Sequence, residues 1–274
     1  MRTISIANFK GGTGKTVTAC NLAALLAREG WRVLLIDADA QHNSTDFYAP
    51  GWEGLSLSDL LNGREIGAVG DWLVRDCLPG LDLLAADMGL LTLDLASILA
   101  DPKAGTGTWD KRLLDFLQAA DGMNGYDFCL IDCPPSFTAA SVAALVVSDE
   151  VVLPTRVDAF SRLGALELIA QVRGLAYYAV SPRFRVLVTM ADGRSRISEQ
   201  AAGQLRRDGL EVFETVIHSS VVVSESSYAR LPLYEYAPRS RAATDYAALM
   251  REILGAAGGA SPSPTDAGSR GRRC

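Results

Sequence analysis

The sequence predicts an α/β fold: a single doubly wound, mostly parallel sheet with helices on both faces. Apolar runs of five or six residues alternate with longer amphipathic stretches along the 274-residue chain, which is the pattern of βα units. The first apolar run leads directly into a glycine-rich turn and an apolar helix. Hydrophobic residues make up 49% of the chain, enough for a full core, so a mainly disordered protein is excluded.

Short apolar runs predict the strands, because runs of this length suit a sheet that is buried on both faces. In chain order they cover residues 3–7, 32–36, 81–85, 128–132, 150–154, 185–190 and 212–217. The amphipathic stretches between them predict helices over residues 15–29, 113–120, 138–148, 159–178, 195–208 and 241–254. The first of these helices ends at Gly30, a residue type that commonly terminates helices.

Residues 1–254 are predicted to form one domain, because no linker composition interrupts them. The segment 255–274 is rich in Gly, Ser, Pro and Ala, and we expect a flexible tail there. No apolar run approaches the roughly 20 residues that cross a bilayer, and the start of the chain lacks the features of a signal peptide. We therefore expect a cytoplasmic protein.

The turn after the first predicted strand has the composition of a phosphate-binding loop. It reads NFKGGTGKT over residues 8–16, and an apolar helix follows at once. Glycines allow backbone N–H groups to point at an anion, Lys15 can reach the β- and γ-phosphates, and the hydroxyl of Thr16 can bind Mg²⁺. The standard pattern GxxxxGK[ST] requires glycine where this chain has Phe9.

The segment KGGTGKT resembles the deviant Walker A ATPases of the ParA/MinD group, within the P-loop NTPases. The resemblance covers residues 1 to about 254 and implies ATP and Mg²⁺ as cofactors. It implies that Lys10 reaches across a dimer interface to the second subunit's nucleotide and that Lys10 and Lys15 act in catalysis. The implied nucleotide-binding positions are Lys10, Gly11, Gly12, Thr13, Gly14, Lys15, Thr16 and Val17.

Two further motifs place carboxylates at the ends of predicted strands. LLIDADAQ resembles the family's DxDPQ motif, which implies that Asp37 helps to hold Mg²⁺ and that Asp39 orients the attacking water. Ala40 stands where the family has proline, and His42 where glycine is common. FCLIDCPPS has the form of a Walker B strand, so Asp132 should hold Mg²⁺ through water while Thr16 binds it directly.

Other positions follow from the resemblance with less support from the residues themselves. The base-binding positions would lie near Met190 and the turn 217–219, where His218 replaces a common proline.

The five cysteines, an odd number at irregular spacing, are expected to be free thiols. Cys129 and Cys133 lie about 13 Å apart on one predicted strand, too far for a single metal ion.

Charge is distributed unevenly along the chain. Residues 1–150 carry a net charge of −10 and residues 151–274 a net charge of +4, from a total of −6. A basic half favours a polyanion-binding face, although arginines spread over the surface would give the same balance. Arg194 matches a DNA-contacting position of the family, and the nearby candidates are Arg196, Arg206, Arg207, Arg239 and Arg241.

The family resemblance leaves more than one function open. The segment after Leu254 has no large apolar residue, which argues against the membrane-binding helix of MinD-type proteins. We therefore expect a plasmid or chromosome partition ATPase that dimerises with ATP, binds DNA nonspecifically, associates with the nucleoid and is stimulated by a ParB-like centromere-binding protein. The alternatives are an ATPase that positions another cytoplasmic cargo, or a MinD-like membrane-associated ATPase. A reductase like the nitrogenase iron protein is disfavoured, because no second cysteine suits a shared cluster.

Overall fold

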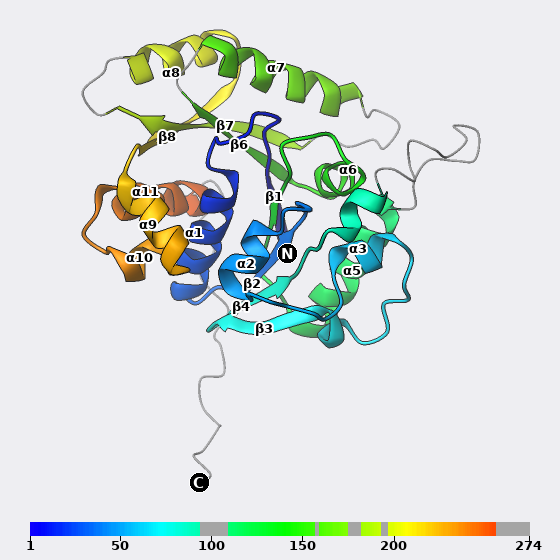
Figure 1. The fold of residues 1–274 in the computed structure, drawn as a ribbon. Helices are drawn as coiled ribbons and strands as arrows, with labels where there is room; N and C mark the ends of the chain where they lie inside the picture. Colours follow the sequence, from blue (N-terminus) through cyan, green and yellow to red (C-terminus); the bar gives the residue numbers. More distant parts are fainter. Residues whose placement is uncertain (94–108, 157–158, 175–181, 193–196, 256–274) are drawn as a thin grey trace.

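The computed structural model describes residues 1–93, 109–156, 159–174, 182–192 and 197–255 of the chain. These residues form one sheet of eight strands with helices on both of its faces (Figure 1). The strand order is β3-β4-β2-β5-β1-β6-β7-β8, and only the β3–β4 pair is antiparallel. The predicted doubly wound, mostly parallel fold is therefore confirmed.

All seven predicted strands are present, with ends that differ from the prediction by at most a few residues. The strands are β1 (Arg2–Ile6), β2 (Val33–Asp37), β3 (Leu73–Leu78), β4 (Leu81–Leu84), β5 (Phe128–Asp132), β6 (Glu150–Arg156), β7 (Arg183–Ala191) and β8 (Glu211–His218). The sequence did not predict β3, because Arg75 and Asp76 interrupt its apolar pattern. It forms an edge hairpin with β4 instead, and the turn passes through Pro79 and Gly80.

The helices fall between the strands as expected for βα units. They are α1 (Lys15–Arg28), α2 (Asn43–Tyr48), α3 (Leu57–Leu61), α5 (Trp109–Asn124), α6 (Ala139–Val146), α7 (Ala159–Gly174), α8 (Ile197–Arg207), α9 (Val221–Ala229), α10 (Leu233–Tyr236) and α11 (Arg241–Gly255), with a 3₁₀ turn at Val69–Trp72. The six predicted helices correspond to α1, α5, α6, α7, α8 and α11. Residues 175–178 and 195–196 of the predicted helices lie outside the described residues, as does the predicted tail beyond Gly255.

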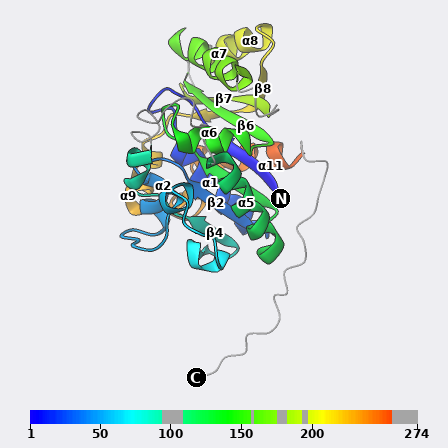
Figure 2. The ribbon, with the colours of Figure 1, turned by 90° about the vertical axis from the view of Figure 1, so that its right-hand side faces the viewer.

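The two faces of the sheet bury separate hydrophobic clusters. On one face α1 and α11 pack over Ile4, Leu35 and Leu130. On the other face α3, α5, α6 and α7 pack over side chains such as Leu34 and Ile131. Alternate residues of β2 and β5 enter opposite clusters, which explains why these two strands are apolar up to their final aspartates. Figure 2 shows α5 and α6 lying across the sheet on this second face.

The last two strands carry bulges that shift their register. Between the paired residues Val186–Val212 and Val188–Val216, β8 has two more residues than β7. The carboxylate of Glu252 in α11 accepts the backbone N–H groups of Glu214 and Thr215 in this bulge, at 2.9 and 3.0 Å. Closer to the carboxyl end, β7 has the extra residue, and there Met190 adopts a φ of 53°.

A membrane span requires a helix that is both long and apolar along its length. Among the helices within the described ranges, none meets both conditions.

Candidate functional site

The loop between β1 and α1 forms an open cradle of backbone groups. Gly12 and Gly14 have φ values of 67° and 89°, which other residues adopt only with strain. A Cβ added at Gly11, Gly12 or Gly14 would meet no atom within 4 Å, so the space beside these three positions is open. Gly14 is the N-cap of α1 and has no side chain to occupy the helix's first N–H groups. The loop and helix therefore present donors to an anion.

Two hydrogen bonds hold the start of this loop in place. The side-chain amide of Asn8, which is buried, donates to the carbonyl of Pro154 at 2.7 Å. Its carbonyl oxygen accepts the backbone N–H of Lys10 at 2.9 Å. Asn8 thus joins β1, β6 and the loop, a positioning role that sequence reasoning did not identify. No sequence pattern indicated it, because the contact depends on β6 lying next to β1 in the sheet.

Lys15 begins α1 and lies at the bottom of the cradle. Its side chain is buried, and its ammonium group donates to the carbonyl of Lys10 at 3.3 Å. Burial lowers the pKa of Lys15, while the carboxylates of Asp132 and Asp39 and the Cys133 thiol act in the opposite direction. Lys15 and two of the three predicted aspartates, Asp39 and Asp132, therefore lie close together. Lys10 is half-buried in the loop.

Asp37 and Asp132 end neighbouring strands and are directly paired in the register of β2 and β5. Burial is the main cause that raises the pKa of both carboxyls, and the charge of Asp132 raises the pKa of Asp37 further. Hydrogen bonds lower these two pKa values: Thr45 donates to Asp37, and Ser44 donates to Asp132. Asp37 accepts both the backbone N–H and the hydroxyl of Thr45, at 2.8 and 2.9 Å. Its other oxygen accepts the N–H of Asp39 at 3.1 Å.

The carboxylate of Asp132 fits a Mg²⁺ site. Its Oδ2 accepts the hydroxyl of Ser44 at 2.8 Å, whereas its buried Oδ1 has no hydrogen-bond partner among the described residues. A buried, unpaired carboxylate oxygen beside a threonine hydroxyl suits a hard cation or its water ligands. Thr16 supplies that hydroxyl, and its proximity lowers the pKa of Asp132. No cluster of three His, Cys, Asp or Glu side chains in the described ranges could hold a metal ion, so phosphate or water oxygens would have to complete the site.

Asp39 lies at the start of the loop that leads to α2. It is half-buried, and its carboxylate accepts the backbone N–H of Gln41 at 3.0 Å. His42 has a φ of 43° and is the N-cap of α2. It stands at a position where glycine is common in the family that this motif resembles. His42 therefore adopts the left-handed conformation that a glycine would adopt without strain. Its ring lies 3.4 Å from the carboxylate of Asp46.

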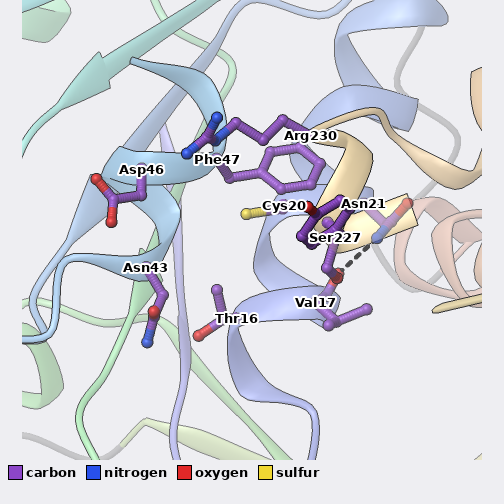
Figure 3. A pocket seen from close by; sticks show the side chains of 10 residues that line it. Thr16, Val17, Cys20, Asn21, Asn43, Asp46, Phe47, Ser227 and Arg230 are labelled. Atoms are coloured by element: carbon purple, nitrogen blue, oxygen red, sulfur yellow. Dashed lines mark hydrogen bonds between the residues drawn. The ribbon is translucent and has the colours of Figure 1, made fainter. Parts of the chain in front are cut away.

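A cavity of about 680 Å³ opens beside Thr16, between α1, α2 and α9. Figure 3 shows Thr16 and Asn43 at one end of the cavity and Phe47 and Arg230 at the other. Asn43, Ser44 and Thr45 belong to the short helix α2, which the sequence did not predict. Together they contribute a cavity-lining amide and the hydroxyls that bind Asp132 and Asp37.

The predicted base-binding residues lie at the ends of β7 and β8, next to the loop. The hydroxyl of Thr189 donates to the carbonyl of Thr13 at 2.9 Å, which places Met190 beside the cradle. Met190 is 41% exposed, and the following residue, Ala191, pairs with His218. Both ring nitrogens of His218 have partners: Nδ1 lies 2.9 Å from Asp245, and Nε2 lies 2.6 Å from Arg241. In this arrangement the His218 ring has no nitrogen left to read a base.

Three of the predicted DNA-contacting arginines have side-chain partners, and two of these three, Arg206 and Arg241, line one cavity together with acidic residues. Arg206 is paired with Glu214 at 2.8 Å, Arg207 donates to Gln204 at 2.7 Å, and Arg241 donates to His218. Arg239 is exposed. Arg194 and Arg196 lie outside the described residues.

The four cysteines that the structure describes are free thiols, as predicted. Cys20, Cys129 and Cys133 are buried and Cys77 is half-buried, while Cys274 lies outside the described residues. Burial raises the pKa of each of the described thiols, so none of them is primed as a nucleophile.

Comparison with known proteins gives consistent similarities. A family model described as "AAA domain" matches residues 1–184. The chain is 36% identical to the chromosome partitioning protein ParA of Caulobacter vibrioides, covering 93% of this chain and 94% of that protein. It is 35% identical to the chromosome-partitioning ATPase Soj of Thermus thermophilus, covering 93% and 96%. The solved structure of apo McdA from Cyanothece superposes with a TM-score of 0.79 at 23% identity, covering 92% and 99%.

The buried Asp37 carboxyl predicts a pH-dependent stability in the metal-free protein. Burial and the charge of Asp132 raise the pKa of Asp37 to about 8, so the folded state binds this proton more tightly than the unfolded chain does. Its contribution to stability is therefore complete below about pH 4 and is lost as the pH rises toward 8. Relative to the parent, Asp37→Asn should gain about 2–3 kcal/mol between pH 5.5 and pH 8 in urea unfolding with EDTA.

The control for this measurement is Asp82→Asn, a buried carboxylate that is paired with Arg75 at 3.2 Å. This variant should show no such gain at the higher pH. Parallel stability curves for the parent and Asp37→Asn would contradict the prediction.

Proposed function

Because this chain belongs to the ParA/Soj family of P-loop ATPases, we propose that it acts as a partition ATPase that separates DNA copies. The observation that carries this proposal is the 36% identity to a chromosome partitioning protein along nearly the whole of both chains. The chain is an ATPase, and its phosphate cradle, buried Lys15 and paired aspartates are the parts that ATP hydrolysis requires.

ATP and Mg²⁺ are the proposed cofactors. The N–H groups of the loop 10–16 and the ammonium of Lys15 would hold the phosphates, while Thr16 and the unpaired Oδ1 of Asp132 would hold the metal or its waters. Mg²⁺, when bound, neutralises phosphate charge and orients the phosphates. Asp37, the third predicted metal residue, would hold a metal-bound water through Oδ1, which accepts only the Asp39 N–H, whereas its Oδ2 accepts two hydrogen bonds from Thr45.

Hydrolysis needs a water molecule held in line with the terminal phosphate, and Asp39 is the proposed residue for this task. Its carboxylate is half-buried at the edge of the cradle and near enough to Lys15 to influence the pKa of that lysine. The Gln41 N–H bond holds the carboxylate in place. Asn43 faces the same cavity as Thr16 and is a second candidate for contact with the water or the phosphate.

The proposed function also includes dimerisation driven by ATP, and nonspecific binding of DNA by the dimer. Lys10 would complete the site of a second subunit, as the resemblance implies. For DNA, the net charge of +4 over residues 151–274 favours a polyanion, but three of the candidate arginines have protein partners. Arg239 therefore has the strongest support for a DNA contact among the described candidates. In the same proposal, a ParB-like protein would bind the ATPase and stimulate its ATP hydrolysis.

Asp39→Ala should stop turnover while leaving ATP binding nearly intact, because this carboxylate acts on the water and not on the phosphates. A fall of at least about 100-fold in kcat is expected for the loss of such a residue. Lys15→Ala should instead weaken ATP binding, because it removes the ammonium group from the cradle. Phosphate release and the binding of a fluorescent ATP analogue measure the two effects. Parent-level turnover by Asp39→Ala would refute the assignment.

ATP should drive a dimer that depends on Lys10. Sedimentation of Asp39→Ala with ATP and Mg²⁺ should give a stable dimer, because hydrolysis no longer removes the ATP. The double variant Lys10→Ala, Asp39→Ala should remain monomeric under the same conditions. Equal dimerisation of the two proteins would rule out the cross-subunit role of Lys10.

The ATP-bound Asp39→Ala dimer should bind unrelated DNA duplexes with similar affinity. Such binding rests on phosphate contacts, so log affinity should fall by about 0.9 per log unit of salt for each phosphate neutralised. Arg239→Ala should lower this slope, whereas Arg207→Ala should change it less. Mobility shifts with ADP and with ATP at two salt concentrations provide the measurement. Binding to liposomes in place of DNA would support a MinD-like function, and binding to neither would support another cargo.

A further inference from the structure

The loop after β5 carries Asp132 at one end but has few contacts of its own. It runs from Cys133 to Phe137, and its residues beyond Pro134 are exposed. At its start, the N–H of Cys133 donates to the carbonyl of Ile6 at 3.1 Å. At its end, Thr138 caps α6 through a reciprocal pair of bonds with Ser141. Between these anchors, neither Ser136 nor the backbone of Phe137 has a hydrogen bond to another described residue.

One aromatic contact joins this loop to the phosphate cradle. The rings of Phe9 and Phe137 lie edge to face, with centroids 5.8 Å apart and planes at 80°. This is a favoured geometry, because the positive edge of one ring meets the negative face of the other. Phe137 is 43% exposed, so hydrophobic burial alone does not explain its position.

The backbone on both sides of Phe9 is held firmly. The side chain of Asn8 donates to β6 and also accepts the N–H of Lys10, so the residue between them has little freedom. Phe9 also packs against the hydrophobic cluster of the α5 and α6 face. Its ring is therefore a rigid surface against which the more weakly held Phe137 can rest. A glycine at this position, as in the standard phosphate-loop pattern, would offer no such surface.

We propose that Phe9 and Phe137 form an aromatic clasp that positions the loop 133–137, and with it the Asp132 end of β5, against the phosphate cradle. Both residues are positioning residues, since neither is placed to touch the phosphates or the metal. The inference rests on the proposed ATPase function of the same site. The clasp acts on the alignment needed for hydrolysis and leaves the N–H groups that bind the phosphates unchanged. It should therefore affect kcat more than the KM for ATP.

The test compares Phe9→Ala, Phe137→Ala and the double variant in steady-state hydrolysis with ATP and Mg²⁺. Each single variant should lower kcat by about 2- to 10-fold, the range expected from the loss of an edge-to-face pair, with KM for ATP changed by less than about 2-fold. The double variant should be no slower than the slower single variant, because one contact is lost in every case. Phe137→Tyr keeps the ring and should restore activity, whereas Phe137→Leu should not.

Leu114→Ala is a matched control, because Leu114 is an apolar side chain of α5 with 44% exposure. It should leave kcat unchanged. Additive losses in the double variant, full activity of either single variant, or rescue by leucine as well as by tyrosine would overturn the clasp.

Two further measurements are needed. The first tests whether Phe137 acts in a subunit interface instead of in the clasp, and the second tests whether the parent protein hydrolyses ATP at all. Loss of ATP-dependent dimerisation in Phe137→Ala but not in Phe9→Ala would place the ring in a subunit interface and overturn the clasp. Hydrolysis by the parent no faster than by Lys15→Ala would overturn the ATPase function together with the clasp. An active parent with unaffected Phe variants would overturn the clasp alone.

Discussion

The register of three central parallel strands is the constraint on which the site depends. Ile6 of β1 and Asp37 of β2 both pair with Asp132 of β5, so these strands end together at one edge of the sheet. A slip of one residue in β5 would turn Asp132 to the opposite face of the sheet. The register is secured by the alternation of buried side chains into two separate cores. Packing far from the loop therefore determines where its charges lie.

The charges at this edge suit a metal–nucleotide complex better than either part alone. Two buried carboxyls, Asp37 and Asp132, lie side by side, and the buried ammonium of Lys15 acts on Asp132, so the site favours an added cation. The neighbouring loop presents N–H groups and the positive end of a helix, which favour an anion. The hydroxyls of Ser44 and Thr45 stabilise the carboxylates without neutralising them. A divalent cation bound to polyphosphate satisfies both halves of the site.

The sequence predicted the parts of this site that follow from local pattern. Apolar runs located the central strands, and glycine spacing located the cradle and Lys15, because both depend on neighbours in the chain. Asn8 and Thr45 were missed, since their roles require strands or loops that are distant in sequence to meet. The base-reading role expected for His218 is not supported by its contacts, because Asp245 and Arg241 occupy its ring nitrogens. Arg206 of α8 and Arg241 of α11 likewise bond to partners that no local pattern indicates, whereas the partner of Arg207 lies one turn earlier in the same helix.

The side chains around β8 also limit how this protein can associate with other chains. This strand is the outer edge of the sheet, where free backbone groups would invite a strand from another molecule. Glu252 and Asp245 occupy the N–H groups of Glu214, Thr215 and His218, and Arg206 approaches the carbonyl of Phe213 at 3.5 Å. The bulge bends the same segment away from a regular ladder. A sheet continued across two molecules through β8 is thereby disfavoured, so crowded copies of this chain are protected from aggregation through this edge of the sheet.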